Sequence, residues 1–194
     1  MTVLETERLI LRPWKVGDTA DAQALFTYAS NPNVGPAASW RPHTSVEESA
    51  EIIRTVLNAP ETYAVVLKRN DEPIGSIGLH QQPSESVINT PGYQPSDMEI
   101  GYWIGEPYWG QGLIPEAARA LLRHGFEDLG LQAIWGTHNV ENTKSSRVMD
   151  KLGLRLIRIE PHVRRELLGD VWRDQAIRRI TREEWEAKVA DALD

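Results

Sequence analysis

The sequence predicts an α/β fold of the α+β type, a single domain over residues 1–194 with a mixed sheet flanked by helices. Two observations support this class. Segments with strand periodicity and segments with helical periodicity follow one another as βααβββαβαββα, which is not the strict alternation of a doubly wound fold. The 194 residues also contain no repeat or linker, and that length suits one hydrophobic core.

The strands and helices are each bounded by local signals. Strands are predicted at 7–12, 63–68, 74–80, 98–104, 132–138, 155–159 and 172–180. Helices are predicted at 19–29 after Asp18, from the capping box Ser45–Glu48 to Leu57, from 114 to 129, between a cap at Asn142 or Thr143 and Gly153, and from the capping box Thr181–Glu184 through Val189. The turn at 70–73 indicates an antiparallel hairpin, and 81–96 is the longest irregular segment.

The stretch from Met98 to Leu129 organises the chain as a strand, a glycine-rich turn and an amphipathic helix. In the strand, Glu99, Gly101 and Trp103 alternate with apolar residues and share one face. The turn Trp109-Gly110-Gln111-Gly112 leaves backbone N–H groups at the start of the helix. Such a terminus carries partial positive charge and binds phosphate or carboxylate.

Composition excludes several classes of function. The chain has no cysteine, so disulfides, thiol catalysis and thiolate metal sites are ruled out, and a reducing cytoplasm is the expected location. A net charge of −7 argues against a general nucleic-acid binder. No segment is apolar over a membrane-spanning length, so no membrane partner is expected.

Four motifs in order carry a resemblance to a known family. They are Glu99-Ile-Gly-Tyr-Trp, Tyr108-Trp-Gly-Gln-Gly-Leu, Glu116-Ala, and Asn142-Thr-Lys-Ser-Ser-Arg-Val-Met-Asp-Lys-Leu-Gly. Together they resemble the GCN5-related N-acetyltransferases, the GNAT superfamily, and most of all its RimJ/RimL branch, which acetylates α-amino groups of ribosomal proteins. The likeness extends over nearly the whole chain, since ETERLILRPW is similar to that branch's opening strand.

This resemblance implies a mostly antiparallel sheet that splits between the strands at 98–104 and 132–138, with acetyl-CoA as co-substrate. It assigns the pyrophosphate to the turn residues Trp109, Gly110, Gln111, Gly112, Leu113 and Ile114. It assigns the pantetheine arm to backbone groups of Tyr102, Trp103 and Ile104 and to Asn142, and assigns protonation of the leaving thiolate to Ser145. Pro107 departs from the family, whose coenzyme motif usually begins there with Gln or Arg, so contributions from residues 107 and 108 are in question.

Acetyl transfer needs a group that removes a proton from the acceptor ammonium. Glu99 is the candidate base, acting directly or through water, and the alternative is a strand glutamate paired with arginine or exposed at an edge. Ser145 is weighed equally as an acid and as a capping residue. His138 is the rival base, whereas His43 and His80 lack partner spacing and rank lower.

The acceptor and its pocket are less constrained by the sequence. Trp40 and Trp103 are expected to line a pocket in which an ammonium binds by cation–π attraction. The pairs Arg164-Arg165 and Arg178-Arg179 are most simply interpreted as solvated surface charge. The 3′-phosphate of the coenzyme could instead contact one of these pairs, and Arg147 and Lys151 are further candidates for that contact. With no Cys and no His-x-x-x-His pair, no metal is predicted.

The sequence therefore predicts an acetyl-CoA-dependent N-acetyltransferase acting on a protein N-terminal α-amine. Three alternatives stay open: a small-amine acetyltransferase for polyamines, amino acids or aminoglycosides, a coenzyme-binding protein without catalysis, and a dinucleotide-binding module. The last lacks the third glycine and the acidic residue that its fingerprint needs. Related enzymes are often dimers and seven tryptophans allow an apolar interface, so a homodimer is also open.

Overall fold

The computed structural model describes residues 1–191, and the chain divides into two compact units. The first unit consists of residues 1–78, 102–120 and 165–171. The second unit consists of residues 79–101, 121–164 and those from 172 on.

One eight-stranded sheet has the order β1-β2-β3-β4-β5-β6-β8-β7. Its strands are β1 (Leu4–Glu5), β2 (Leu9–Arg12), β3 (Thr62–Leu67), β4 (Glu72–His80), β5 (Met98–Ile104), β6 (Ala133–Asn139), β7 (Arg155–Arg164) and β8 (Trp172–Thr181). The pairs β1–β2, β2–β3, β3–β4, β6–β8 and β7–β8 are antiparallel, whereas β5 and β6 pair in parallel from Met98↔Ile134 to Ile100↔Gly136. The predicted mixed, mostly antiparallel sheet is confirmed.

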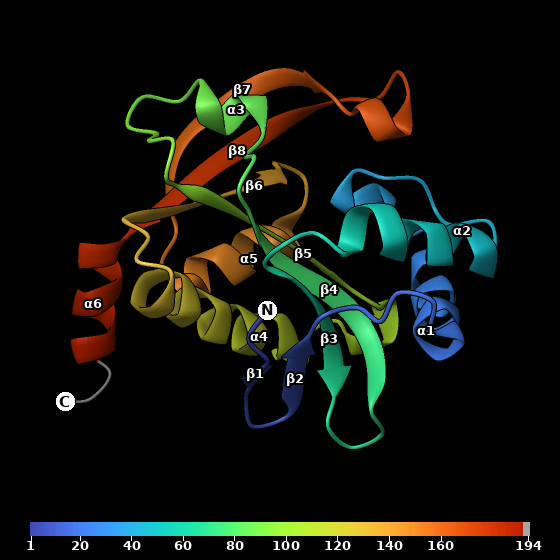
Figure 1. Ribbon diagram of the computed structural model, residues 1–194. Coiled ribbons are helices and arrows are strands. Elements are labelled where there is room, and N and C mark those ends of the chain that lie inside the picture. Colours follow the sequence, from blue (N-terminus) through green and yellow to red (C-terminus); the bar gives the residue numbers. More distant parts are fainter. Residues whose placement is uncertain (192–194) are drawn as a thin grey trace. The chain divides into compact units, whose positions relative to one another are not determined.

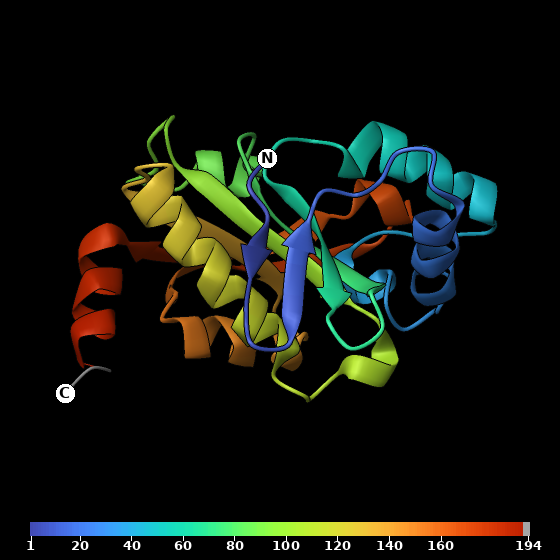
Figure 2. The same ribbon diagram turned by 60° about the horizontal axis from the view of Figure 1, so that its bottom comes forward.

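In the first unit, two helices pack beside each other over the β2–β3 part of the sheet. They are α1 (Thr19–Ala29) and α2 (Val46–Ile52), and both Figure 1 and Figure 2 show them side by side. The core between them and the strands is formed by Trp14, Ala22, Leu25, Ala29, Ile53, Leu57, Ala64 and Val66. α2 continues as one wide π-helical turn, Ile53–Leu57, so the predicted end of this helix at Leu57 is confirmed.

In the second unit, β7 and β8 form a long antiparallel ribbon beside β6 (Figure 1). A small core of Val87, Trp135 and Ile177 lies where the helix α3 (Glu85–Ile88) covers this ribbon. β7 is longer than predicted because its ladder with β8 continues to Arg164↔Trp172. The segment 81–96 is likewise not fully irregular, since it contains α3.

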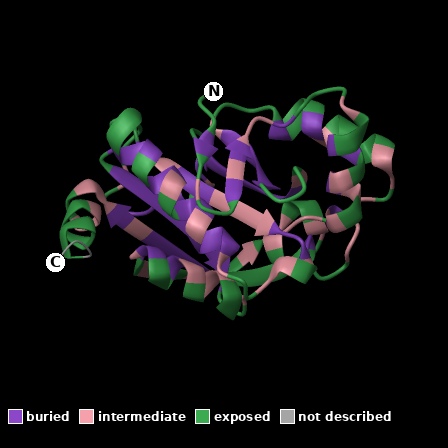
Figure 3. Cartoon of the chain, turned by 90° about the horizontal axis from the view of Figure 1, so that it is seen from below, coloured by how far each residue is buried: buried purple, intermediate pink, exposed green. Residues whose placement is uncertain are grey.

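The remaining helices are α4 (Leu113–Arg123), which continues as a π-helical turn over His124–Asp128, α5 (Thr143–Leu152) and α6 (Arg182–Asp191). Figure 3 shows strands that are largely buried and helices whose outer faces are exposed. Within the described part of the chain, no helix combines the length and the hydropathy needed to cross a bilayer.

The predicted helix caps are present. Asp18 accepts hydrogen bonds from the amides of Ala20 and Asp21 at 2.8 and 3.0 Å. Ser45 accepts from the amide of Glu48 at 3.1 Å. In the second capping box, the Thr181 amide donates to the Glu184 carboxylate, and the Glu184 amide donates to the Thr181 hydroxyl. Each bond spans at most three residues, which is why sequence alone identified it.

Candidate functional site

The turn that precedes α4 is shaped by two glycines in the first unit. Gly110 and Gly112 both have φ of +75°, a conformation that side-chain-bearing residues rarely adopt. Trp109 lies between β5 and these glycines, and its backbone is extended. Its indole N–H donates to the carbonyl of Ile104 at 2.9 Å. The chain then enters α4 at Leu113, where the first-turn amides have no acceptor within the helix. The predicted strand, turn and helix are confirmed.

The β1–β2 hairpin fixes the start of α4. The carboxylate of Glu116 accepts from the Thr6 hydroxyl at 2.6 Å and from the Arg8 amide at 2.9 Å, and it pairs with the Arg8 guanidinium at 2.6 Å. The same guanidinium donates to the carbonyl of Gln111 at 3.1 Å. Burial acts to raise the pKa of Glu116, but these donors outweigh it and lower the pKa below its usual value. Arg8 therefore neutralises Glu116 and holds the turn at once.

A second set of bonds fixes the 3-10 helix Glu106–Tyr108, where Pro107 departs from the family motif. The Tyr108 and Tyr28 hydroxyls are 3.1 Å apart, and their rings meet edge to face. The side-chain amide groups of Asn31 and Asn33 donate hydrogen bonds to the Glu106 carboxylate. Residues 106–108 are therefore held by the end of α1, and Pro107 contributes its carbonyl, which accepts from the Gln111 side chain at 2.8 Å.

The two tryptophans predicted to line an acceptor pocket lie together in the first unit. The rings of Trp40 and Trp103 meet edge to face with centroids 5.7 Å apart, and Trp40 also contacts His43 at 5.3 Å. Gly35 allows the loop to close on this ring, because a Cβ at residue 35 would lie 2.6 Å from Trp40. Both tryptophans are partly buried against the first unit's core.

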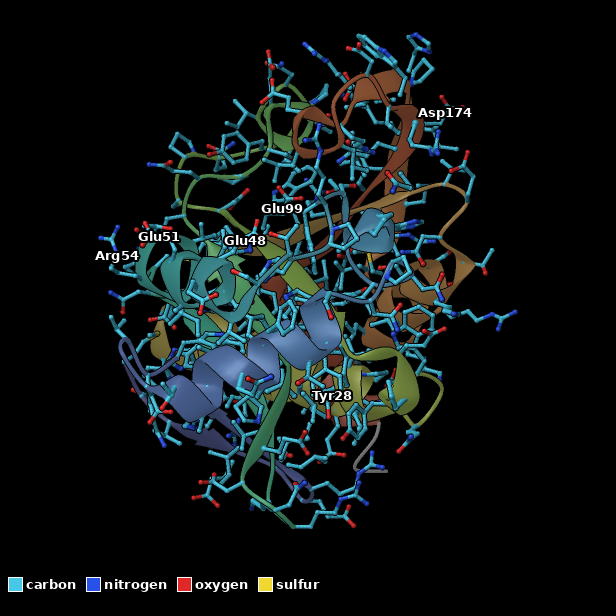
Figure 4. The ribbon with its side chains drawn as sticks, turned by 90° about the vertical axis from the view of Figure 1, so that its right-hand side faces the viewer. Tyr28, Glu48, Glu51, Arg54, Glu99 and Asp174 are labelled. Atoms are coloured by element: carbon cyan, nitrogen blue, oxygen red, sulfur yellow. The ribbon has the colours of Figure 1, made fainter. Side chains whose placement is uncertain are left out.

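In the second unit, Glu99 on β5 is buried, with 8% of its surface exposed. Its carboxylate accepts from the Ser84 amide at 2.7 Å and from the Thr137 hydroxyl at 2.6 Å (Figure 4 labels Glu99). Within residues 1–191, Glu99 is therefore neither paired with an arginine nor exposed at a sheet edge, which were the alternatives that its sequence position left open. By contrast, Glu51 on α2 and Arg54 in the π-helical turn that follows it, also labelled in Figure 4, form an exposed ion pair.

His80 lies beside Glu99, a proximity that the sequence analysis did not predict. A Cβ on Gly101 would lie 2.7 Å from Nε2 of His80, so the imidazole covers Gly101 on the face that also carries Glu99. Burial lowers the pKa of His80, and the charge of Glu99 opposes this effect. Pairing the predicted strands 74–80 and 98–104 as antiparallel neighbours is the signal that would have brought the two residues together.

The first turn of α5 carries the other two predicted coenzyme residues. The Asn142 side chain caps the helix by accepting from the Ser145 amide at 3.0 Å, which decides between the two predicted caps. Ser145 thus takes part in the cap through its backbone, and the role of its hydroxyl stays a prediction. Gly153, with φ of +88°, ends the helix as predicted.

His138 cannot act as the rival base because both of its ring nitrogens are engaged. Nδ1 donates to the carbonyl of Asn139 at 2.9 Å, and Nε2 accepts from the Nε–H of Arg178 at 3.1 Å. A carbonyl only accepts and a guanidinium only donates, so the ring is fixed as one neutral tautomer. Burial lowers the pKa of His138 accordingly.

The expectation that Arg178 is solvated surface charge is wrong. Its side chain is buried and donates to Asp150 at 2.6 Å, to the Leu154 carbonyl at 3.1 Å and to the Ser146 hydroxyl at 2.8 Å. Arg179 also has a packing role, since its guanidinium lies 5.2 Å from the ring centre of the buried Trp135. These contacts join strands and a helix distant in sequence, so local patterns did not reveal them.

Among the described residues, no group of three or more His, Asp or Glu side chains is arranged to hold a metal ion. The residues predicted for the site offer backbone amides, the buried carboxylate of Glu99 and hydroxyl groups. Backbone N–H groups at a helix start suit an oxyanion such as a phosphate, and a carboxylate on a strand suits proton transfer from an ammonium.

Comparison with known proteins gives a consistent result. A family model described as an acetyltransferase (GNAT) domain matches residues 8–155. The chain is 29% identical over 183 residues to YnaD of Bacillus subtilis (strain 168), described as an uncharacterized N-acetyltransferase, covering 94% of this chain and 98% of YnaD.

Solved structures share the fold. An acetyltransferase of the GNAT family from Bacillus anthracis superposes with a TM-score of 0.77 at 26% identity, covering 94% of this chain and 100% of that one. A ribosomal-protein-S5-alanine acetyltransferase from Vibrio fischeri superposes with a TM-score of 0.70 at 18% identity, covering 95% and 99%, which shows likeness of fold alone. The sequence motifs, the sheet order and the family match over residues 8–155 together identify the chain as a member of the GNAT family of N-acetyltransferases.

Proposed function

We propose that this N-acetyltransferase moves the acetyl group of acetyl-CoA directly to a primary amine, and that the amine is the α-amino group of a protein N-terminus. The observation that carries the proposal is the turn Trp109–Gly112, where two glycines with positive φ lead into the first-turn amides of α4. The resemblance of the sequence motifs to the RimJ/RimL branch supports the choice of acceptor.

The turn suits the pyrophosphate of acetyl-CoA by the chemistry of its donors. A Cβ at Gly110 would meet no atom within 4 Å, so the side of the turn that this Cβ would occupy is open. Glu116 is the acidic residue in the first turn of α4, and its pairing with Arg8 at 2.6 Å keeps it from repelling an anion. We therefore assign the pyrophosphate to the six turn residues Trp109, Gly110, Gln111, Gly112, Leu113 and Ile114.

The other predicted residues keep their proposed roles. Acetyl-CoA supplies its acetyl group as an activated thioester. Tyr102, Trp103 and Ile104 are assigned to its pantetheine arm through backbone groups, and Ile104 already accepts one bond from the Trp109 indole. Asn142 is assigned to the same coenzyme, and the Ser145 hydroxyl to protonation of the departing thiolate.

The acceptor amine is assigned to Glu99 and to the tryptophan pair. Each Glu99 oxygen accepts one hydrogen bond and retains capacity for another, so the carboxylate supports loss of the ammonium proton directly or through a neighbouring group. The edge-to-face pair of Trp40 and Trp103 offers aromatic surface to a cation. The proposal takes residues 1–194 as one catalytic domain.

A thiol-release assay tests the function cleanly because the chain has no cysteine, so a thiol reagent reports only coenzyme A. The acceptors are tripeptides that begin with alanine or serine, and spermidine and kanamycin represent small amines. We expect calorimetric binding of acetyl-CoA, and thiol release that depends on a tripeptide, with acetylation of its α-amine detected by mass spectrometry.

Each alternative predicts a different result in the same experiment. Release with spermidine or kanamycin alone would favour a small-amine acetyltransferase. Binding of acetyl-CoA without release from any amine would favour a non-catalytic coenzyme-binding protein. Absence of acetyl-CoA binding at millimolar ligand would refute the proposal, and NAD binding in its place would favour a dinucleotide module.

A further inference from the structure

Strands β4 and β5 run antiparallel and bring His80 to Glu99. At one end of the pair, the Gly105 amide donates to the Ile74 carbonyl at 2.8 Å. Antiparallel partners step in opposite directions along their strands, so continuing this register places His80 opposite Glu99. Side chains in directly opposite positions have Cβ atoms roughly 5 Å apart on the same face.

Gly101 explains how the imidazole fits on this face. Residue 101 follows Glu99 by two positions, so a side chain there would project from the same face of β5. Its Cβ would lie 2.7 Å from Nε2 of His80, which is closer than real Cβ contacts. The absence of a side chain at Gly101 therefore leaves room for the His80 ring next to the carboxylate.

The two groups differ in access and in freedom. Glu99 is 8% exposed, and its oxygens hold the Ser84 amide and the Thr137 hydroxyl. His80, at the end of β4, keeps solvent-exposed surface, although neighbouring atoms shield its ring from part of the water. An amine arriving from solvent can therefore reach the imidazole, whereas the Glu99 carboxylate is buried and fixed by two donors.

The surroundings of the ring favour a neutral base. Glu99, across on β5, is the ionisable group that acts on His80, and its charge favours the protonated ring. Loss of water around the ring acts in the opposite direction, is the larger effect, and lowers the pKa of His80. The imidazole is then unprotonated near neutral pH and ready to accept a proton.

We propose that His80 is the catalytic base that takes the proton from the substrate ammonium, and that Glu99 is a positioning residue whose negative charge stabilises the resulting imidazolium. This rests on the proposed acetyl transfer. In the step, the ammonium N–H bond breaks and the proton moves to the imidazole. The amine nitrogen then forms the bond to the acetyl carbon, the carbon–sulfur bond breaks, and the second proton lost by the nitrogen goes to the departing thiolate. Overall, one amide, one thiol and one proton released to water are formed.

The test compares His80→Asn and Glu99→Gln with the wild type, and His162→Asn serves as the matched control, because His162 is an exposed histidine on β7. The acceptor is whichever of the four amines, the alanine tripeptide, the serine tripeptide, spermidine or kanamycin, releases most thiol. The measured quantity is kcat between pH 5.5 and 9 with acetyl-CoA saturating, since kcat reports groups in the enzyme–substrate complex.

We expect His80→Asn to lower kcat at neutral pH by about a hundredfold, the usual contribution of a general base, and to remove the acidic limb of the profile. We expect Glu99→Gln to keep that limb but move it to lower pH, because the imidazolium loses its stabilising charge. His162→Asn should match the wild type. The reverse pattern, in which Glu99→Gln removes the limb and His80→Asn retains it, would assign the base to Glu99 and overturn the proposal.

Titration of the imidazole by NMR gives a readout that does not need turnover. The His80 signal is identified by its loss in His80→Asn, and its pKa should fall in Glu99→Gln. An unchanged His80 pKa would refute the pairing even in an active enzyme. Failure of the wild type to release thiol with every amine would overturn the acetyl transfer and this role together, whereas the reverse pattern above overturns this role alone.

Discussion

At the scale of single residues, Arg178 shows how a buried cation is accommodated. Its guanidinium donates to a ring nitrogen of His138, a carboxylate oxygen of Asp150, a hydroxyl of Ser146 and a backbone carbonyl. Removing the donor leaves several of these acceptors without a partner, and unsatisfied buried polar groups cost more than the net value of a hydrogen bond. The network also holds the first turn of α5, where Asn142 and Ser145 lie.

Arg178→Met should therefore destabilise the protein by about 3 kcal/mol, the lower end for breaking a buried ion pair because the Asp150 side chain is 60% exposed. Urea unfolding followed by tryptophan fluorescence measures the change. Arg119→Met, at an exposed position on α4, is the control and should shift stability by less than about 0.5 kcal/mol. Equal losses in both variants would show that the network adds nothing.

At the scale of elements, the turn before α4 is held by bonds from three separate segments. Arg8 donates to the Gln111 carbonyl and forms an ion pair with Glu116. The Tyr28 hydroxyl forms a hydrogen bond with the Tyr108 hydroxyl, and the Trp109 indole donates to the carbonyl at the end of β5. A turn fixed before the ligand arrives loses less entropy on binding, so preorganisation of this kind raises affinity.

Gly110→Ala tests the turn against a matched glycine. Gly110 (φ +75°) and Gly17 (φ +80°) both face open space, so alanine at either should cost about 1 kcal/mol of stability through backbone strain alone. Only Gly110→Ala should also weaken acetyl-CoA binding, by about tenfold in the calorimetric Kd, because the turn amides must shift. If Gly17→Ala weakened binding equally, the effect would be one of global stability.

Elements were predicted well where their signals are local. The caps at Asp18, Ser45 and Asn142 are bonds between residues no more than three apart, so each is legible in the sequence. The contacts of Arg8 with Glu116, of His80 with Gly101 and of Arg178 with His138 join segments whose pairing must be known first. The glycine-rich turn and the helix caps were therefore predicted, whereas the long-range contacts that hold them were not.

At the scale of the whole molecule, stability should fall as the pH is lowered. Burial lowers the pKa of His43, His80 and His138. On acidification these histidines therefore take up protons at a higher pH in the unfolded chain than in the folded chain. By linkage, a group with a depressed pKa in the folded state stabilises the fold above its unfolded pKa and loses that contribution on acidification. The loss begins near pH 6.5, the ordinary histidine value.

A second loss should begin near pH 4.5, where unfolded carboxyl groups take up protons. Burial acts against ionisation of Glu116 and Glu184, but their hydrogen bonds and arginine partners prevail and lower both pKa values. Urea unfolding at pH 7.5, 5.5 and 4 should show a falling free energy of unfolding, and His138→Gln should reduce the fall between pH 7.5 and 5.5. A free energy that rose over that interval would contradict the assignment.

Strand β8 is late in the chain but lies between β6 and β7 in the sheet. Residues 8–155, the range that defines family membership, end before it. A chain trimmed to that range would leave β6, Ala133–Asn139, as a bare sheet edge with its row of N–H and C=O groups exposed. Such edges recruit strands from other molecules, so a trimmed protein should self-associate rather than serve as a minimal enzyme.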